Sequence, residues 1–352
     1  MKKNVFHLFL LLFFFLFAFS QEIIENPEKP LSTYAGRILK LEEVLRITDE
    51  GGEFYFKRPT YLQIADDGCI FLYDSEQFLK FSPEGGFLKN LFEKGQGPGE
   101  LQRFTRYTLR DMDIFIYDSG NSKILHTSQE GKLIEEFRLT ERYSLLLGLF
   151  GDHFIFTTMN FPETEEKTGN FIDIPTSILI LSNQEEVINE YPSVTQRAYS
   201  SENFMMSWGR SFTILSEDGQ FCIWSDPDEY MITVLDVDTG TIVRKFKRKY
   251  PRVKAPERKT PPGRPVLKIP ERKFLSDISY IYTFQGNILV WTSKKDEKKG
   301  MLFDLFDKKG KYIDSYWVNV NGTVIATHED FFFVREQDEE GNINIVKYLV
   351  VE

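Results

Sequence analysis

The sequence predicts an all-β fold, a six-bladed β-propeller built from four-stranded antiparallel blades. Short runs rich in Phe, Tyr, Ile and Val recur between turn residues, whereas apolar residues at helical spacing are nearly absent. A unit of four strands returns about every 40–50 residues, a period typical of propeller blades. The last unit lacks one strand, which indicates that another part of the chain completes the ring.

The clearest unit spans residues 60–92. Turn residues at Asp66-Asp67-Gly68 and Pro83-Glu84-Gly85-Gly86 separate its apolar runs. Its strands are expected at 60–64, 69–73, 78–81 and 87–92. Four strands joined by tight turns form one antiparallel meander.

The unit then repeats along the chain, and Asp118 of the second copy falls 44 residues after Asp74 of the first. The strands of the later copies are expected at 107–109, 113–118, 123–127 and 133–137; at 153–157, 177–181 and 187–191; at 212–215, 220–224, 231–236 and 241–246; at 280–283, 288–292, 300–306 and 312–318; and at 323–326, 331–335 and 343–351. A polar, acidic stretch, residues 160–176, interrupts the third copy, and we expect it to be a loop.

The segment 37–47 resembles a strand but precedes the first blade and has no partner of its own. Because an unpaired sheet edge is a template for aggregation, we expect this segment to join the sixth blade as its outermost strand. Residues 37–352 then form a single domain, preceded by a linker over residues 21–36.

The first 20 residues predict an exported protein. Met1-Lys2-Lys3 is followed by an apolar run from Val5 to Phe19 and by a small-x-small sequence that ends at Ser20. This order is typical of a cleaved secretory signal. The run is shorter than the roughly 20 residues that span a bilayer, so an uncleaved anchor is the less favoured alternative. We expect a secreted or periplasmic protein.

The charge of the chain is unevenly distributed. The full chain carries −10, and removal of Lys2 and Lys3 with the signal leaves −12, which argues against a general nucleic-acid binder. Residues 244–273, however, hold thirteen Lys or Arg against Glu257 and Glu271, a local charge of +11. We therefore expect a monomer with an acidic surface and one basic segment.

We refer to residues 247–276 as the basic excursion, because its six prolines predict an extended loop between the fourth and fifth blades. Three roles are open: a solvated tether, attraction to an envelope protein or another anionic surface, and docking onto the protein's own acidic blades. The candidate residues for an anionic partner are Lys247, Arg248, Lys249, Arg252 and Lys254.

Only two cysteines occur, Cys69 and Cys222, and each lies in an apolar, strand-like run. A disulfide framework is therefore excluded, and we expect two buried free thiols.

The stretch Gly95–Leu101 contains three glycines and a proline and lies between the first and second blades. It lacks the Gly-Lys-Ser/Thr ending of a phosphate-binding loop, so we expect a tight connector. Its charged neighbours Glu100, Arg103 and Arg106 are candidates for ligand binding at one mouth of the central channel.

Sequence signatures of catalysis are scarce. The chain has no Gly-x-Ser-x-Gly, no His-Glu-x-x-His and no zinc spacing of cysteines and histidines. His126 and His153 fall on or beside strands and are expected to be structural. Asp74, Asp118 and Asp226 recur regularly, as turn-forming aspartates do, although calcium at the channel axis is an alternative.

The repeated order of Asp-Gly, a short aromatic strand and Asp, seen at Asp67-Gly68 to Asp74 and at Asp218-Gly219 to Asp226, resembles secreted bacterial six-bladed propellers of the NHL-repeat and TolB-like kind. The segment Gly95–Leu101 is similar to one found in many bacterial members. The resemblance covers residues 37–352 and implies a fold but no assigned chemistry, because propellers host many functions.

From these features we expect a non-catalytic binding or scaffolding module of the cell envelope, without a catalytic residue, a metal site or a cofactor. The alternative is an enzyme, a hydrolase or lyase that uses calcium at the central channel.

Overall fold

The computed structural model describes residues 23–49, 51–161, 169–200, 205–257 and 270–351. The expected signal peptide lies outside these residues. Every regular element within them is a strand, and none of them belongs to a helix that could cross a membrane.

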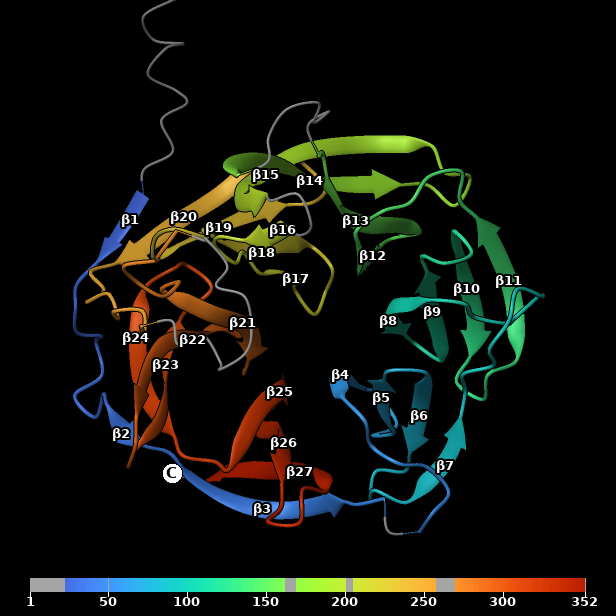
Figure 1. Cartoon of the computed structure of the whole chain (residues 1–352), viewed down its shortest axis with the longest axis horizontal. Helices are drawn as coiled ribbons and strands as arrows, with labels where there is room; N and C mark the ends of the chain where they lie inside the picture. Colours follow the sequence, from blue (N-terminus) through green and yellow to red (C-terminus); the bar gives the residue numbers. More distant parts are fainter. Residues whose placement is uncertain (1–22, 50, 162–168, 201–204, 258–269, 352) are drawn as a thin grey trace, which may run out of the picture.

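Six small sheets stand around a central axis like the blades of a propeller, which confirms the predicted fold (Figure 1). Blade 1 comprises β4 (Pro59–Ile64), β5 (Ile70–Asp74), β6 (Gln77–Phe81) and β7 (Phe87–Asn90); blade 2 comprises β8 (Phe104–Arg110), β9 (Asp113–Asp118), β10 (Lys123–Ser128) and β11 (Leu133–Arg138); blade 3 comprises β12 (Leu145–Phe150), β13 (His153–Met159), β14 (Asn170–Leu181), β15 (Val187–Ser200) and β16 (Met205–Ser207).

The chain continues around the ring in the same direction. Blade 4 comprises β17 (Thr213–Leu215), β18 (Phe221–Ser225), β19 (Met231–Asp236), β20 (Ile242–Arg248) and β1 (Ile23–Asn26); blade 5 comprises β21 (Ile278–Phe284), β22 (Asn287–Asp296), β23 (Gly300–Phe306), β24 (Tyr312–Val318) and β2 (Arg37–Ile38); blade 6 comprises β25 (Gly322–His328), β26 (Phe331–Gln337), β27 (Ile343–Val351) and β3 (Lys40–Ile47). The innermost strands are β4, β8, β12, β17, β21 and β25 (Figure 1).

The apolar core lies between the blades. Six clusters of buried side chains each draw their members mainly from two neighbouring blades, so that every pair of neighbours shares one cluster. For example, the fully buried rings of Phe303 in blade 5 and Phe332 in blade 6 meet with their centroids 5.9 Å apart. Burial between blades therefore holds the ring together, because it removes the apolar faces of all six sheets from water.

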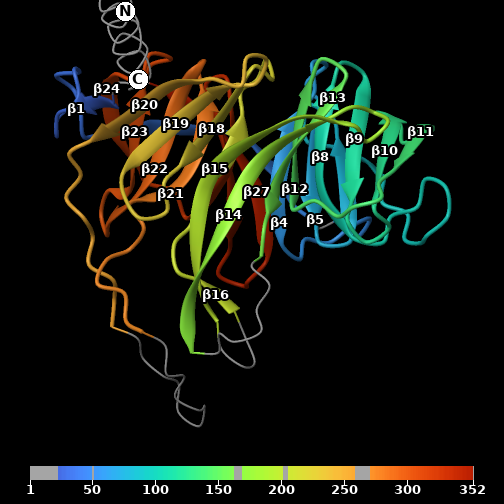
Figure 2. The ribbon, with the colours of Figure 1, turned by 90° about the horizontal axis from the view of Figure 1, so that it is seen from above.

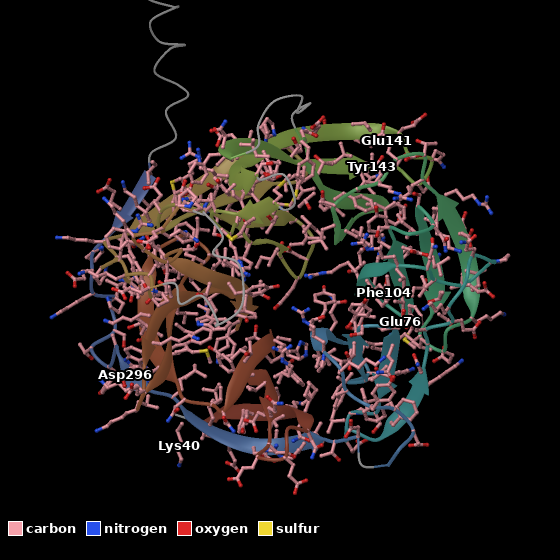
Figure 3. All side chains as sticks on the ribbon, viewed as in Figure 1. Lys40, Glu76, Phe104, Glu141, Tyr143 and Asp296 are labelled. Atoms are coloured by element: carbon pink, nitrogen blue, oxygen red, sulfur yellow. The ribbon has the colours of Figure 1, made fainter. Side chains whose placement is uncertain are left out.

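The predicted closure of the ring is confirmed. Strand β3 runs antiparallel to β27, with a register that extends from Ile47 opposite Ile345 to Lys40 opposite Val351. Lys40, the first residue of β3, lies at the outer rim of the ring (Figure 3). The N-terminal segment thus completes the blade that ends the chain.

Two details of the N-terminal prediction need correction. Arg37–Ile38 does not join blade 6 but pairs in parallel with β24 of blade 5, and β1, inside the expected linker, pairs in parallel with β20 of blade 4. The amide of Asn26 then donates to the carbonyl oxygen of Gly310 at 2.9 Å, which ties blade 4 to blade 5. Blades 4 and 5 gain a fifth strand because the outer edges of β20 and β24 offer unpaired backbone groups.

Blade 3 also differs from the expectation. Residues 170–176, expected to be a loop, belong to β14, and β15 extends past the ring to Ser200. The alternation of Ile172 and Ile174 on β14, with Ala198 opposite Ile172 on β15, builds a small core of its own, which stabilises the extension. We call this segment the blade 3 extension (residues 170–176, 195–200 and 205–207).

The face at which the innermost strands begin is here called the entry face. The described parts of the basic excursion, up to residue 257 and from residue 270, lie on this face, because they follow the end of β20 and precede the start of β21. The blade 3 extension leads through β16 to the start of β17 and projects from the ring in the same direction as the excursion (Figure 2).

Candidate functional site: the central channel

A cavity of about 680 Å³ runs along the axis of the ring. Its walls come from all six innermost strands, so that residues far apart in the sequence, such as Tyr61 of blade 1 and Ile214 of blade 4, line the same cavity. A cavity of this size can hold a small organic molecule.

The innermost strands carry β-bulges near their beginnings. The register shifts lie between Pro59 and Tyr61, Phe104 and Arg106, Leu146 and Gly148, Ile278 and Tyr280, and Val324 and Ala326. A bulge changes the direction of the adjacent side chains. Five of the six blades therefore redirect side chains at the same level of the channel.

Three polar side chains meet in this bulged layer: Tyr61 of blade 1, Arg106 of blade 2 and Tyr280 of blade 5. Each follows its bulge directly, and all three line the cavity. The guanidinium of Arg106 lies over the ring of Tyr61, 3.5 Å from its centroid. This short cation–π contact orients the arginine side chain within the channel.

The protonation states of these groups follow from their surroundings. Burial alone would lower the pKa of Arg106, but the phenol oxygens of Tyr61 and Tyr280 outweigh it, and the pKa is raised. Burial also raises the pKa of Tyr61, and the charge of the nearby Arg106 offsets part of this increase. At neutral pH the layer therefore presents a permanent cation and a protonated phenol.

The far end of the channel is acidic. Asp66, Asp111, Glu217 and Asp218, at the ends of β4, β8 and β17, are exposed and line the cavity there. The guanidinium of Arg110 lies at the same end, where Nη1 is 3.5 Å from a carboxylate oxygen of Asp152. The channel thus has a cationic layer near the entry face and an acidic rim at the other end.

Of the three residues predicted at the channel mouth, the structure brings only Arg106 into the cavity. The carboxylate of Glu100 turns back on its own loop and accepts a hydrogen bond from the Gly97 N–H at 2.8 Å. Arg103 has an exposed side chain outside the cavity, and its backbone N–H donates to Asp118 at 2.7 Å.

The stretch Gly95–Leu101 is a connector, as predicted. Its carbonyl oxygens at Gly95 and Gly97 accept hydrogen bonds from Asn121 and Lys123, so the loop packs against blade 2 beside β10. A Cβ atom at Gly95 would lie 1.8 Å from the Glu100 carboxylate, and Gly99 has a φ of +78°. Glycine is required here because the loop folds tightly onto its own side chain.

The recurring aspartates serve as backbone acceptors. Asp74 accepts from the N–H groups of Lys57 and Arg58 just before β4, and Asp118 does the same for Gln102 and Arg103 before β8. Each therefore fixes the chain where it enters the innermost strand of its blade.

No group of three or more His, Cys, Asp and Glu side chains in the described part of the chain is arranged to hold a metal ion.

The basic excursion uses several of its cations inside the molecule. Nζ of Lys247 lies 3.1 Å from a carboxylate oxygen of Glu25, and Nε of Arg252 lies 3.0 Å from one of Asp277. Lys249 and Lys254 are exposed, and no ion pair links them to the described residues. Both legs are held together by the hydrogen bonds Ala255 N to Lys273 O and Leu275 N to Val253 O, so part of this predicted loop is paired.

Arg248 is buried at the base of the excursion. Its Nε donates to Asp304 at 2.8 Å, and the hydroxyls of Tyr230 and Tyr312 donate to the same carboxylate at 2.6 and 2.7 Å. Burial would lower the pKa of Arg248, but the Asp304 carboxylate raises it overall. Arg248 is therefore an anchor between blades 4 and 5 and is not available to an external anion.

The remaining singled-out residues are mostly structural. His126 is hydrogen-bonded to Asp113 at 2.7 Å and stacks on Phe115, whereas Nδ1 of His153 is buried without a partner. Cys69 and Cys222 are both buried and free, as expected.

Sequence reasoning missed Tyr61 and Tyr280 as partners of Arg106. An alignment of the repeats could have found them, since all three occupy the third position of an innermost strand. The sequence contains no other sign that they meet.

Comparisons with known proteins support the fold. Residues 48–206 match the model of a family described as a 6-bladed beta-propeller. Two Bacteroides crystal structures are similar: a protein of Bacteroides fragilis described as exported (16% identity, TM-score 0.59, 94% of this chain and 100% of that chain) and a member of the DUF4221 family from Bacteroides vulgatus (12% identity, TM-score 0.57, 89% and 98%). No curated protein matches the sequence. At such identities the likeness shows the fold alone.

Proposed function

We propose that this protein is an exported, non-catalytic binding propeller of the cell envelope that holds its ligand in the central channel. The observation that carries the proposal is the bulged layer, which directs Tyr61, Arg106 and Tyr280 from three blades into one cavity. Convergent polar groups in a partly apolar cavity are typical of a ligand site.

The chemistry of this layer favours binding over catalysis. A guanidinium cannot act as a base at physiological pH, and the raised pKa of Tyr61 keeps its phenol protonated. Among the described residues that line the cavity, the carboxylates lie at the far rim rather than beside Arg106. A permanent cation and a protonated phenol can hold and orient a ligand without acting as a general base.

A plugged channel tests this function. Ile214 lines the cavity from β17, whereas Val243 is exposed on the outer strand β20 of the same blade. Protein purified from the cell envelope is denatured, and the released small molecules are identified by mass spectrometry. We expect a ligand from the wild type and from Val243→Trp but not from Ile214→Trp. When added back, the ligand should be recovered unchanged. Equal recovery from the plugged variant, or conversion to a product, contradicts the proposal.

The calcium-dependent enzyme is the alternative that a chelator tests. If calcium is absent from the fold, EDTA leaves the melting temperature unchanged, because no ligand is removed from the native state. A decrease that added calcium reverses would favour a metal-assisted hydrolase or lyase.

The exported location and the anionic partner belong to the same proposal. The description of the Bacteroides fragilis protein as exported supports the location. Lys249 and Lys254, two exposed cations of the excursion, support attraction to an anionic surface or envelope protein. Binding to vesicles that contain anionic lipid should fall steeply with salt and decrease when both lysines are changed to Ala. Binding that salt does not affect would exclude the electrostatic explanation.

A further inference from the structure

Arg106 is a cation that the described residues do not neutralise. The groups that face it are the phenols of Tyr61 and Tyr280, and its Nε is fully buried without a hydrogen-bond partner. This contrasts with Arg248, the buried arginine at the base of the excursion, which is paired with Asp304.

A guanidinium without an ionic partner in this cavity is compensated only in part. The contact with the Tyr61 ring supplies that part, because the face of an aromatic ring attracts a cation. The planar fork of N–H donors is suited to a carboxylate, which it binds through two parallel hydrogen bonds. A bound anion would therefore satisfy both the charge and the free Nε–H.

The surroundings of Arg106 indicate what the rest of the ligand is like. The walls near this layer include Leu147 of blade 3, Ile214 of blade 4 and Ile325 of blade 6. The layer thus offers one cation among tyrosines and aliphatic side chains. This combination fits an anion with a single charge and an apolar or aromatic body better than a multiply charged phosphate, which needs several donors.

The charges along the channel indicate the direction of entry. Asp111 directly follows β8 and is five residues beyond Arg106, a distance of about 16 Å along an extended chain. The acidic rim at that end repels an anion, whereas the entry face leads directly to the cationic layer. An anionic ligand therefore enters from the entry face, with its carboxylate foremost.

We propose that the channel binds an organic monocarboxylate with an apolar or aromatic body, whose carboxylate pairs with Arg106 between Tyr61 and Tyr280. This inference rests on the proposed function, the occupation of the channel by a ligand, and adds the chemical class of that ligand.

The test uses 4-fluorobenzoate as the probe and ¹⁹F NMR line broadening as the measure of binding. The neutral analogue 4-fluorobenzyl alcohol reports on the charge, and hexanoate and inorganic phosphate serve as competitors. Arg106→Met removes the cation but keeps an unbranched side chain. Arg110→Met is the matched control, because it removes an arginine from the same strand at the acidic end. Melting temperatures show whether each variant is folded.

We expect the wild type and Arg110→Met to bind the probe alike, and Arg106→Met to bind it about tenfold more weakly or worse, since charge-assisted hydrogen bonds are the strong ones. Hexanoate should displace the probe, phosphate should not, and the alcohol should bind weakly. Arg106→Met should melt no lower than the wild type, because it loses a buried charge without an ionic partner. If that variant does not fold, Arg106→Lys, which keeps the charge but not the fork, should show intermediate binding.

Several outcomes would overturn the inference. Equal binding to Arg106→Met refutes the role of the arginine while leaving a channel ligand possible, and displacement by phosphate as strong as by hexanoate refutes the ligand class. Wild-type protein that binds no probe at millimolar concentration also refutes the class. If the probe binds the Ile214→Trp variant as well as the wild type, the channel is not the site, and the proposed function itself fails.

Discussion

At the scale of single residues, Arg248 differs from the half-buried Arg106 because it has an ionic partner. Arg248 is 7% exposed and Asp304 fully buried, and their ion pair is completed by two tyrosine hydroxyls. Rings of Tyr230, Tyr250 and Tyr312 also surround the guanidinium at 4.8–5.0 Å. Such a network is structural, because every partner comes from the protein itself.

Arg248→Met is therefore expected to destabilise the protein by about 3 kcal/mol or more, because it leaves the Asp304 carboxylate buried without its cation. Urea unfolding measures the difference. Lys249→Met changes the exposed neighbour and should alter the free energy of unfolding by less than about 0.5 kcal/mol. Equal stability of the two variants would show that the buried pair adds nothing to the fold.

The two thiols should be unreactive in the native protein. Burial raises the pKa of Cys222 to about 12, and burial followed by the nearby Asp67 raises the pKa of Cys69. Because only the thiolate is nucleophilic, we expect neither cysteine to react with iodoacetamide at pH 7 until the protein is denatured, when both react. Mass spectrometry counts the added groups, and rapid labelling of the native protein would contradict the buried positions.

At the scale of elements, the ring depends on the pairing of β3 with β27, which joins the two ends of the chain and is here called the clasp. Without β3, strand β27 of blade 6 would expose an unpaired edge and part of the cluster between blades 6 and 1 would lose its cover. The clasp therefore protects both backbone and core.

Deletion of residues 37–47 should abolish folding or produce oligomers through the exposed edge of β27. Deletion of residues 23–26, which removes only the added strand β1, should have a smaller effect, because β20 keeps its pairing with β19. Thermal melting and size-exclusion chromatography distinguish these results. A melting transition unchanged by the first deletion would show that the clasp is dispensable.

Blade 3 shows how an element can depart from its repeat. The sequence between residues 160 and 176 is polar and acidic, which favours a loop, but its second half pairs with β15 and buries Ile172 and Ile174. The aromatic cluster of Phe171, Tyr199 and Trp208 adds contacts, with the rings of Phe171 and Trp208 centred 4.6 Å apart. Tertiary pairing here overrides a polar composition.

At the scale of the whole molecule, the expected location and monomeric state remain predictions. When the full chain is produced in a bacterium with a secretory pathway, the mature protein should begin at Gln21, because cleavage after Ser20 follows the small-x-small sequence. N-terminal mass spectrometry of the exported protein checks this, and light scattering checks the monomer. A protein that retains residues 1–20 in the membrane fraction would support an uncleaved anchor instead.

The sequence by itself determined the fold class, the number of blades and the need for an N-terminal strand to close the ring. These features depend on local signals, namely the alternation of apolar residues, the turn residues and the repeat period. Such signals are contained in the sequence of each repeat and in the spacing between repeats. Arg106 could likewise be singled out as a charged neighbour of the connector Gly95–Leu101.

Only the tertiary structure decided which side chains meet. Tyr61, Arg106 and Tyr280 come from different blades, and their meeting depends on bulges that a sequence pattern does not display. The same limit explains why Glu100 and Arg103 were candidates, although one turns back on its own loop and the other faces outward. Closure of the ring brings residues distant in sequence around one axis, and the direction of each side chain there is set by contacts with other blades rather than by its own neighbours in the chain.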